Sequence, residues 1–262
     1  LAYTVVREAL LGFERQAGLT VAGIVPVSAL RGDNVTQPLD AAWYQGPSLL
    51  QLLESLPAAQ ERKDGDLLIP VQYVARDGEG TGNQPRTLWG RVAHGRVRAG
   101  DAVQIFPSGQ LATVAEVRLA GAVVDVVEAG QSAGVVLDTQ IDVSRGDWIS
   151  TPQTIHEAQR FSATLAWLDT EPAQVGRKYW VRHGNRWVQA RIASIESRLD
   201  IHNLEAIEAH QLAVNEIGHV IIETQQALPI EAYESNRVGG SLIVVDPTSN
   251  RTSGALLVKG AA

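Results

Sequence analysis

The chain has 262 residues, 45% of them hydrophobic, and at roughly 100–150 residues per domain this length suggests two domains with sizeable cores. Its formal net charge of −7 argues against a nucleic-acid binder that works mainly by neutralising phosphates, because such a surface must be basic. The absence of cysteine excludes disulfides, zinc–thiolate sites, iron–sulfur clusters and thiol catalysis.

The N-terminal part shows the alternation of helix and strand that is typical of an α/β domain. Residues 3–17 carry apolar side chains at helical spacing, and Gly18 follows as a helix stop. The apolar, β-branched run 19–30 predicts a buried strand that ends in a turn. After a polar loop, Pro47 is expected at the first position of a second helix, which presents a wide leucine face over 47–56.

The rest of the chain has a different character. The segment 57–66 is polar, charged and without periodicity, and it predicts a linker. Beyond it, β-type runs alternate with Gly, Asp and Ser turns at a spacing of about 8–12 residues, the pattern of antiparallel barrels. We therefore predict a mostly β chain: the remnant of an α/β domain over 1–58, a first β-barrel over 66–152 and a second over 156–262.

A hairpin is predicted over 178–192, with its turn at His183-Gly184-Asn185. It carries Trp180 and Trp187, which are expected to form a cross-strand pair. Core packing explains most of the six tryptophans, although one or two could mark an interface. The basic side chains of the hairpin are interpreted as a solvated surface, with RNA stacking as the alternative.

No arrangement of side chains nominates a catalytic or metal site. The six histidines lack the spacings H-x₃-H and HExxH, so they are interpreted as surface or satisfied-core histidines. In the string DVSRGD, residues Asp142, Arg145 and Asp147 are expected to form a turn with local salt bridges. The string Asp77-Gly78-Glu79-Gly80 spells DxxG, but no phosphate loop precedes it, and we interpret it as a charged surface turn.

The order of an α/β domain followed by two barrels resembles that of the translational GTPases. Ser28, Ala29 and Leu30 stand within VPVSALRGDNV, at the place where this class carries its last nucleotide motif. The resemblance implies that a backbone N–H of this loop contacts the guanine carbonyl oxygen, and that a small residue is needed because the base packs against the loop. Residues 43–56 and 90–109 resemble the segment that closes the GTPase domain and the core hairpin of the second domain.

Within that class the chain is most similar to the GTPase subunit of bacterial ATP sulfurylase (the large subunit of sulfate adenylyltransferase), and the resemblance covers almost the whole chain. The more specific strings are DVSRGD (142–147), LAVNEIGHV (212–220) and the series within 233–255. The loop 75–92 departs from the family pattern, and SGALLV replaces a usual AGM-type ending.

The resemblance implies a cytoplasmic parent that binds GTP with Mg²⁺, hydrolyses the GTP and pairs with a small catalytic subunit as a heterodimer. That subunit joins ATP and sulfate into adenosine 5′-phosphosulfate and pyrophosphate, an uphill reaction that GTP hydrolysis drives. The chain lacks methionine and begins inside a predicted helix, so we expect a C-terminal piece of such a parent. Whether an adenosine phosphosulfate kinase domain follows Ala262, as in some members, is left open.

The 262 residues contain neither GxxxxGK[ST] nor NKxD. We therefore expect no catalytic residue, no metal site and no tight GTP binding in this stretch, and interpret it as a docking and coupling module. One rival is a translation factor that binds aminoacyl-tRNA, which the acidic balance and the DVSRGD and NEIG strings disfavour. The other is a two-barrel binding module that was never part of a GTPase. No membrane segment is expected, because the apolar runs are far shorter than the roughly 20 residues of a span.

Overall fold

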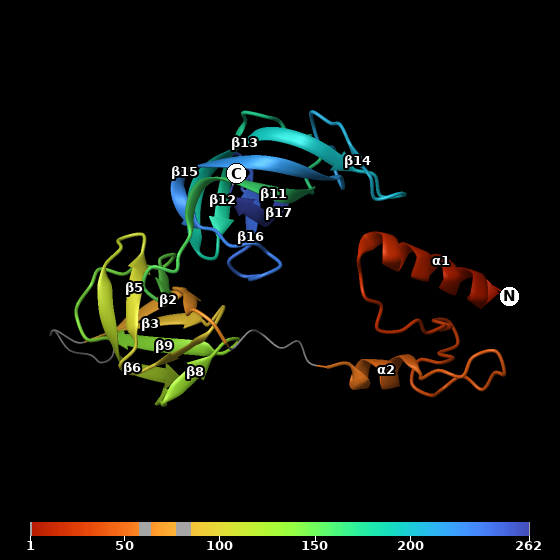
Figure 1. Ribbon diagram of the computed structural model, residues 1–262, viewed down its shortest axis with the longest axis horizontal. Coiled ribbons are helices and arrows are strands. Elements are labelled where there is room, and N and C mark those ends of the chain that lie inside the picture. The colour runs from red at the N-terminus through yellow and green to blue at the C-terminus, as the bar shows by residue number, and fades with distance from the viewer. Residues whose placement is uncertain (1, 58–63, 77–84, 262) are drawn as a thin grey trace. The chain divides into compact units, whose positions relative to one another are not determined.

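The computed structural model describes residues 2–57, 64–76 and 85–261, which fold as a mostly β chain (Figure 1). The chain divides into two compact units, Leu1–Gln60 and Glu61–Ala262. The predicted linker lies for the most part outside the described residues, as does the DxxG string. None of the described helices has both the length and the apolar character needed to cross a bilayer.

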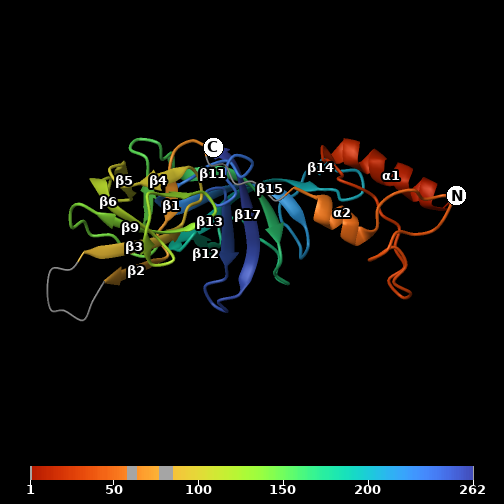
Figure 2. The ribbon, with the colours of Figure 1, turned by 90° about the horizontal axis from the view of Figure 1, so that it is seen from below.

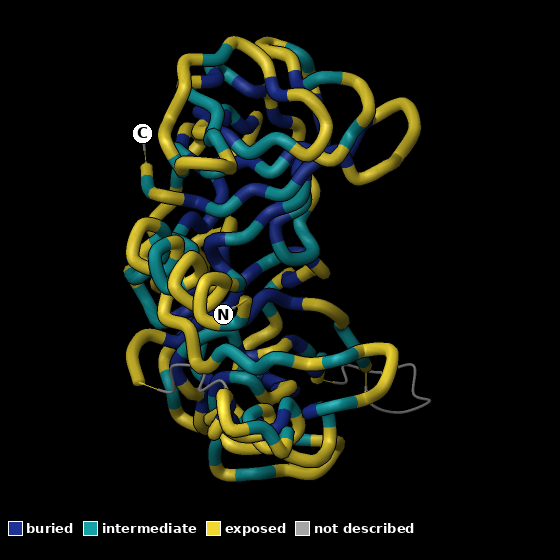
Figure 3. The backbone as a smooth tube through the Cα atoms, turned by 90° about the vertical axis from the view of Figure 1, so that its right-hand side faces the viewer, coloured by how far each residue is buried: buried dark blue, intermediate teal, exposed yellow. Residues whose placement is uncertain are grey.

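Helix α1 (Ala2–Ala17) confirms the first predicted element. Gly18 ends it with a φ of +65°, a conformation that glycine adopts without strain. The apolar side chains of the helix are not covered: Val6, Leu10 and Phe13 are 55%, 44% and 42% exposed. Figure 3 shows the contrast between this N-terminal part and the buried strands of the barrels.

The strand predicted over 19–30 is wrong. Residues 19–27 have no regular structure, and only an isolated bridge joins Ser28 to Asp33. A strand is stable only when its backbone groups pair with a neighbour. No other strand lies among the described residues of the first unit, so the apolar run has nothing to pair with.

Helix α2 (Leu49–Ser55) begins later than predicted, because Ser48 is its N-cap. The Ser48 Oγ accepts from the Gln51 N–H at 3.3 Å, and the Gln51 side chain accepts from the Ser48 N–H at 3.0 Å. This reciprocal pair is a capping box. Pro47 therefore lies outside the helix, one residue before the cap, and not at its first position.

The first barrel is a sheet with the strand order β1-β10-β5-β6-β9-β3-β2, and β7 pairs with β6. Beyond this order, β1 also contacts the segment after β3, because the Leu68 N–H donates to the His94 carbonyl at 3.2 Å and the Ala93 N–H donates to the Leu68 carbonyl at 2.8 Å. A separate ribbon joins β4 to β8. The strands are β1 (Leu68–Pro70), β2 (Tyr73–Arg76), β3 (Arg86–Arg91), β4 (Arg96–Arg98), β5 (Ala102–Phe106), β6 (Leu111–Leu119), β7 (Ala122–Val123), β8 (Val126–Glu128), β9 (Ser132–Leu137) and β10 (Trp148–Ser150).

The second barrel is closed, because its first and last strands pair with each other. Its order is β12-β16-β17-β11-β15-β13, and β13 pairs back with β12; the short β14 pairs with β13 outside the ring. Strand β11 pairs with β15 on one side and with β17 on the other. Figure 2 shows the long strand β17 leading to the C-terminus. The strands are β11 (Glu157–Trp167), β12 (Lys178–His183), β13 (Arg186–Leu199), β14 (Ala206–Ile207), β15 (Ile217–Pro229), β16 (Ser241–Val245) and β17 (Thr252–Ala261).

Each barrel has its own core of alternating inward side chains. The first core is built mainly from valine and isoleucine, and the second adds Phe161, Leu165 and Trp167. Both barrels belong to the second unit. Their division into domains over 66–152 and 156–262 stays a prediction.

The hairpin β12–β13 is confirmed, with His183 opposite Arg186 and a two-residue turn at Gly184 and Asn185. This register places Trp180 opposite Gln189 and Trp187 opposite Arg182. The expected tryptophan pair is therefore wrong. The length of the turn decides which residues face each other, and it leaves the two indoles only diagonal to one another.

Candidate functional site: the Ser28 loop and the junction of the barrels

The Ser28 loop is a tight turn closed by its own backbone. The Ser28 N–H donates to the Asp33 carbonyl at 3.1 Å, and the Gly32 N–H donates to the Ser28 carbonyl at 2.7 Å. The Ser28 Oγ accepts from the Arg31 N–H at 3.3 Å. Behind the turn, the buried Asn34 side chain donates to the Pro26 carbonyl at 2.9 Å. The polar groups of the loop are thus largely used to hold its shape.

The tip of this loop faces outward. Ala29 is exposed and Leu30 is 97% exposed. Within the described ranges, the backbone N–H groups of Ala29 and Leu30 have no acceptor. Two unpaired donors beside a small side chain have the chemistry needed to bind a flat carbonyl-bearing ring. The predicted contact of Ser28, Ala29 and Leu30 with guanine stays a prediction.

The second candidate region is the junction between the two barrels, where strings far apart in the sequence meet. The DVSRGD turn is bound to the first barrel, since the Val71 N–H donates to the Asp147 carbonyl at 2.8 Å and the Gly146 N–H donates to the Val71 carbonyl at 2.9 Å. Gly146 has a φ of +98°, and a Cβ there would lie 3.0 Å from the Asn185 carbonyl oxygen. The backbone of one barrel thus closely approaches the hairpin turn of the other.

The expected turn is present, since the Asp147 N–H donates to the Ser144 carbonyl at 3.1 Å, but the expected salt bridges within it are wrong. Asp142 pairs with Arg86 of the first barrel at 3.7 Å, and the other two charges cross the junction. Asp147 pairs with Arg186 of β13 at 3.4 Å, and Arg145 donates to the Asn185 Oδ1 at 3.4 Å. The side chains of Asp147 and Arg186 are both mostly buried. Arg186 is therefore not part of a solvated basic surface, as the sequence suggested. It is an ion-pair partner across the junction.

Two aromatic rings pack at the same place. The rings of Trp148 and His183 lie 4.7 Å apart, and both residues are fully buried. The His183 Nε2 donates to the Gly239 carbonyl at 2.9 Å, which sets the tautomer because a carbonyl only accepts. Burial lowers the pKa of His183 to about 4, so the ring is neutral at pH 7. His183 is thus a core histidine, as expected, but only its Nε2 is satisfied, since the buried Nδ1 has no hydrogen-bond partner among the described residues.

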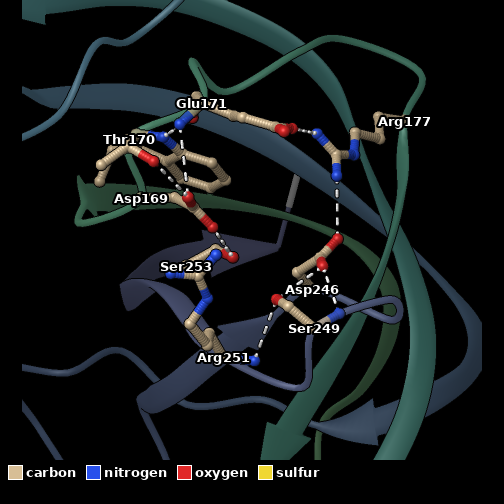
Figure 4. Close-up of polar contacts among 9 residues, drawn as sticks. Asp169, Thr170, Glu171, Arg177, Asp246, Ser249, Arg251 and Ser253 are labelled. Atoms are coloured by element: carbon tan, nitrogen blue, oxygen red, sulfur yellow. Dashed lines mark hydrogen bonds and ion pairs between the residues drawn. The ribbon is translucent and has the colours of Figure 1, made fainter.

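The string DPTSNRTSG is held by a polar network at one end of the second barrel (Figure 4). Asp246 accepts from Arg177 at 2.9 Å and from the Ser249 N–H and Oγ at 2.7 and 2.8 Å. Ser253 donates to Asp169 at 2.7 Å. The Ser249 N–H and then its hydroxyl lower the pKa of Asp246, and the Ser253 hydroxyl lowers that of Asp169. Carboxylates held anionic in this way fasten a loop and are poor general bases.

No three His, Asp or Glu side chains group so as to hold a metal ion within residues 2–57, 64–76 and 85–261. DVSRGD, the hairpin turn and the segment at Val238 and Gly239 meet at one junction, and no pattern in the sequence indicated this meeting. The close approach of Gly146 to Asn185 is visible only in three dimensions.

Two β-barrels that follow a helical unit along the chain give this protein an elongation-factor-like fold. Residues 160–259 match the family described as GTP-eEF1A C-terminal domain-like. The fold is shared with the crystal structure of Sup35 complexed with GMPPNP, with a TM-score of 0.69 and 22% identity over 90% of this chain and 58% of that one.

The chain is 35% identical to sulfate adenylyltransferase subunit 1 of Laribacter hongkongensis, over 98% of this chain and 53% of the relative. It is 38% identical to the bifunctional enzyme CysN/CysC of Mycobacterium tuberculosis, over 89% of this chain and 39% of the relative. The chain thus belongs to the family of sulfate adenylyltransferase subunit 1, and it spans about half the length or less of the curated relatives it matches.

Proposed function

We propose that this chain is part of the GTPase subunit of a sulfate adenylyltransferase. In that assembly GTP hydrolysis drives the synthesis of adenosine 5′-phosphosulfate from ATP and sulfate by a small catalytic subunit. The observation that carries the proposal is the likeness to sulfate adenylyltransferase subunit 1, which extends over 98% of the chain and so includes the Ser28 loop and both barrels.

In this proposal Ser28, Ala29 and Leu30 form part of a guanine site. The free N–H groups of Ala29 and Leu30 would donate to the carbonyl oxygen of the base. The phosphates and Mg²⁺ need a GxxxxGK[ST] loop, which these 262 residues do not contain. The chain alone therefore contributes no catalytic residue and binds GTP weakly at best.

The barrels would transmit the change that GTP hydrolysis produces. The buried Asp147–Arg186 pair and the packed Trp148–His183 rings join them at the junction. A displacement imposed on the first barrel is then passed to the second as a rigid-body movement, which is a common form of allosteric coupling. The two barrels thus act as a lever and as a docking surface for the small subunit.

Calorimetric titration of this chain with a sulfate adenylyltransferase small subunit tests the proposal. We expect saturable binding without nucleotide, over an interface of about 800 Å² or more per partner if the complex is stable. An absence of binding at high concentration would contradict the docking role. Salt-sensitive binding of tRNA in its place would favour the translation-factor alternative.

A further inference from the structure

The outer face of the second barrel carries an apolar groove where a water-facing sheet normally alternates to polar residues. The groove has a volume of about 590 Å³ and crosses β16 and β17. Ile243, Ala255 and Leu257 point outward into it, while their neighbours along each strand are buried in the core. Ile243 is paired with Ala255 in the register, so the apolar side chains form a continuous strip.

Two arginines flank this strip. Arg237 is exposed and Arg182 is half-buried, and both line the groove. The Arg182 guanidinium donates to the Gly184 carbonyl and to the Asn185 Oδ1, both at 2.9 Å. It also lies 5.7 Å from the centre of the Trp187 ring, which is 49% exposed. The arginine is therefore held in place by neutral groups.

Arg182 and Arg237 differ from most described arginines of this barrel because they make no ion pair with a carboxylate. Among the described residues from 156 to 261, most arginines make an ion pair with a carboxylate: Arg160, Arg177, Arg186, Arg191 and Arg198. Arg251 acts on the Asp169 carboxylate, whose pKa it helps to lower. Arg182 and Arg237 have no ion pair with a carboxylate within these residues, and both line the groove. The nearby Glu234 is turned toward Lys259 at 4.0 Å.

We propose that this groove binds an acidic segment of the small catalytic subunit, with an apolar side chain on the strip and carboxylates on Arg182 and Arg237. The inference rests on the proposed function and names the surface that it uses. Uncompensated positive charge on a chain of net charge −7 selects an acidic ligand by charge complementarity. Two guanidiniums beside an apolar strip match a protein segment better than a nucleic-acid backbone, which needs many phosphate contacts.

The test is calorimetric titration of the full chain and its variants with a sulfate adenylyltransferase small subunit. Arg237→Glu reverses the exposed charge, and Ile243→Asn removes the apolar contact without changing charge. We expect each to weaken binding about tenfold or more, because arginine and apolar anchors carry most of the energy of an interface. Arg96→Glu is the matched control, since Arg96 is exposed on the first barrel, and it should bind as the wild type does. Equal circular dichroism and melting temperatures show that each variant is folded.

The outcomes separate the two proposals. If the wild type binds and both groove variants bind equally well, the groove is not the docking site, while the proposed function stands. If the wild type does not bind at all, the docking role in the proposed function and the groove inference are both overturned. If the wild type is a dimer that Arg237→Glu converts to a monomer, a second copy of the chain occupies the groove and the inference is wrong.

Discussion

The first unit leaves most of its apolar side chains exposed, whereas the barrels bury many of theirs. Among the described residues of the first unit, Tyr44 is the one apolar side chain that is buried, whereas the barrels bury two large clusters. Helix α1 nevertheless forms, and the apolar run 19–27 does not become a strand. A helix satisfies its backbone within itself, but a strand depends on a partner. The comparison shows that a helix forms with modest tertiary support, here the contacts of Tyr3 with Trp43 and Tyr44, whereas a strand needs a paired neighbour.

The largest expected effect is the loss of unfolding free energy when a core side chain of the second barrel is shortened, compared with the same change in α1. Leu165→Ala in the fully buried core of the second barrel should lower the free energy of unfolding by about 2–5 kcal/mol. Leu10→Ala in α1, where the side chain is 44% exposed, should cost less than about 1 kcal/mol. Urea denaturation followed by tryptophan fluorescence measures both. Equal losses would show that the first unit has a core as important as that of the barrels.

The next effect is a pH dependence specific to the junction. His183 has a pKa of about 4 in the folded chain and an ordinary value of 6.5, so between these values the unfolded chain binds a proton that the folded chain does not. The stabilising contribution of the neutral His183 is therefore complete above pH 6.5. Its loss toward pH 4 lowers the free energy of unfolding by up to about 3 kcal/mol. Urea denaturation at pH 7, 6 and 5 measures the slope.

His183→Gln is the matching variant, since its amide still reaches a carbonyl but does not titrate. It should flatten the slope between pH 6.5 and 5. The carboxylates of Asp246 and Glu216 do not interfere there, because their pKa values lie below the ordinary 3.8 and 4.5. A slope that is unchanged in the variant would mean that His183 is not buried at the junction.

The smallest expected effect is confined to helix α2 of the first unit. Ser48→Ala removes the N-cap of α2 and should cost that helix about 1 kcal/mol, because an orphan N–H of the first turn loses its acceptor. Hydrogen exchange should become faster over Leu49–Ser55 and stay unchanged in the barrels. Ser55→Ala, at the other end of the same helix, is the control. Faster exchange in the barrels would show that the two units are energetically linked.

Several features could be predicted because they depend on neighbours in the sequence. The helix over 3–17 follows from apolar spacing, its stop from Gly18, and the hairpin from alternation around a Gly-Asn turn. The series of β-strands after the first unit was also visible through turn spacing, whereas the strand expected in the α/β piece did not form. The exact cap at Ser48 was missed, although Gln51 three residues later carries the capping-box signal.

The loop of Ser28, Ala29 and Leu30 shows where prediction from the sequence ends. Its residues were identified by resemblance, but the free N–H groups at its tip depend on the hydrogen bonds that close the turn. The DVSRGD string was identified as well, and its ion pairs were assigned to the wrong partners. Asp147 and Arg186 are 39 residues apart, and no local pattern links them.

The sequence by itself determined the composition class, the helices, the hairpin and the series of β-strands, since these follow from propensity, periodicity and turn residues. Only the tertiary structure decided that the second barrel closes through β12 and β13, that His183 is buried against Trp148, and that residues 19–27 form no strand. The physical reason is that strand pairing, burial and ion pairing are contacts between distant segments. Their free energy depends on which surfaces meet when the chain folds.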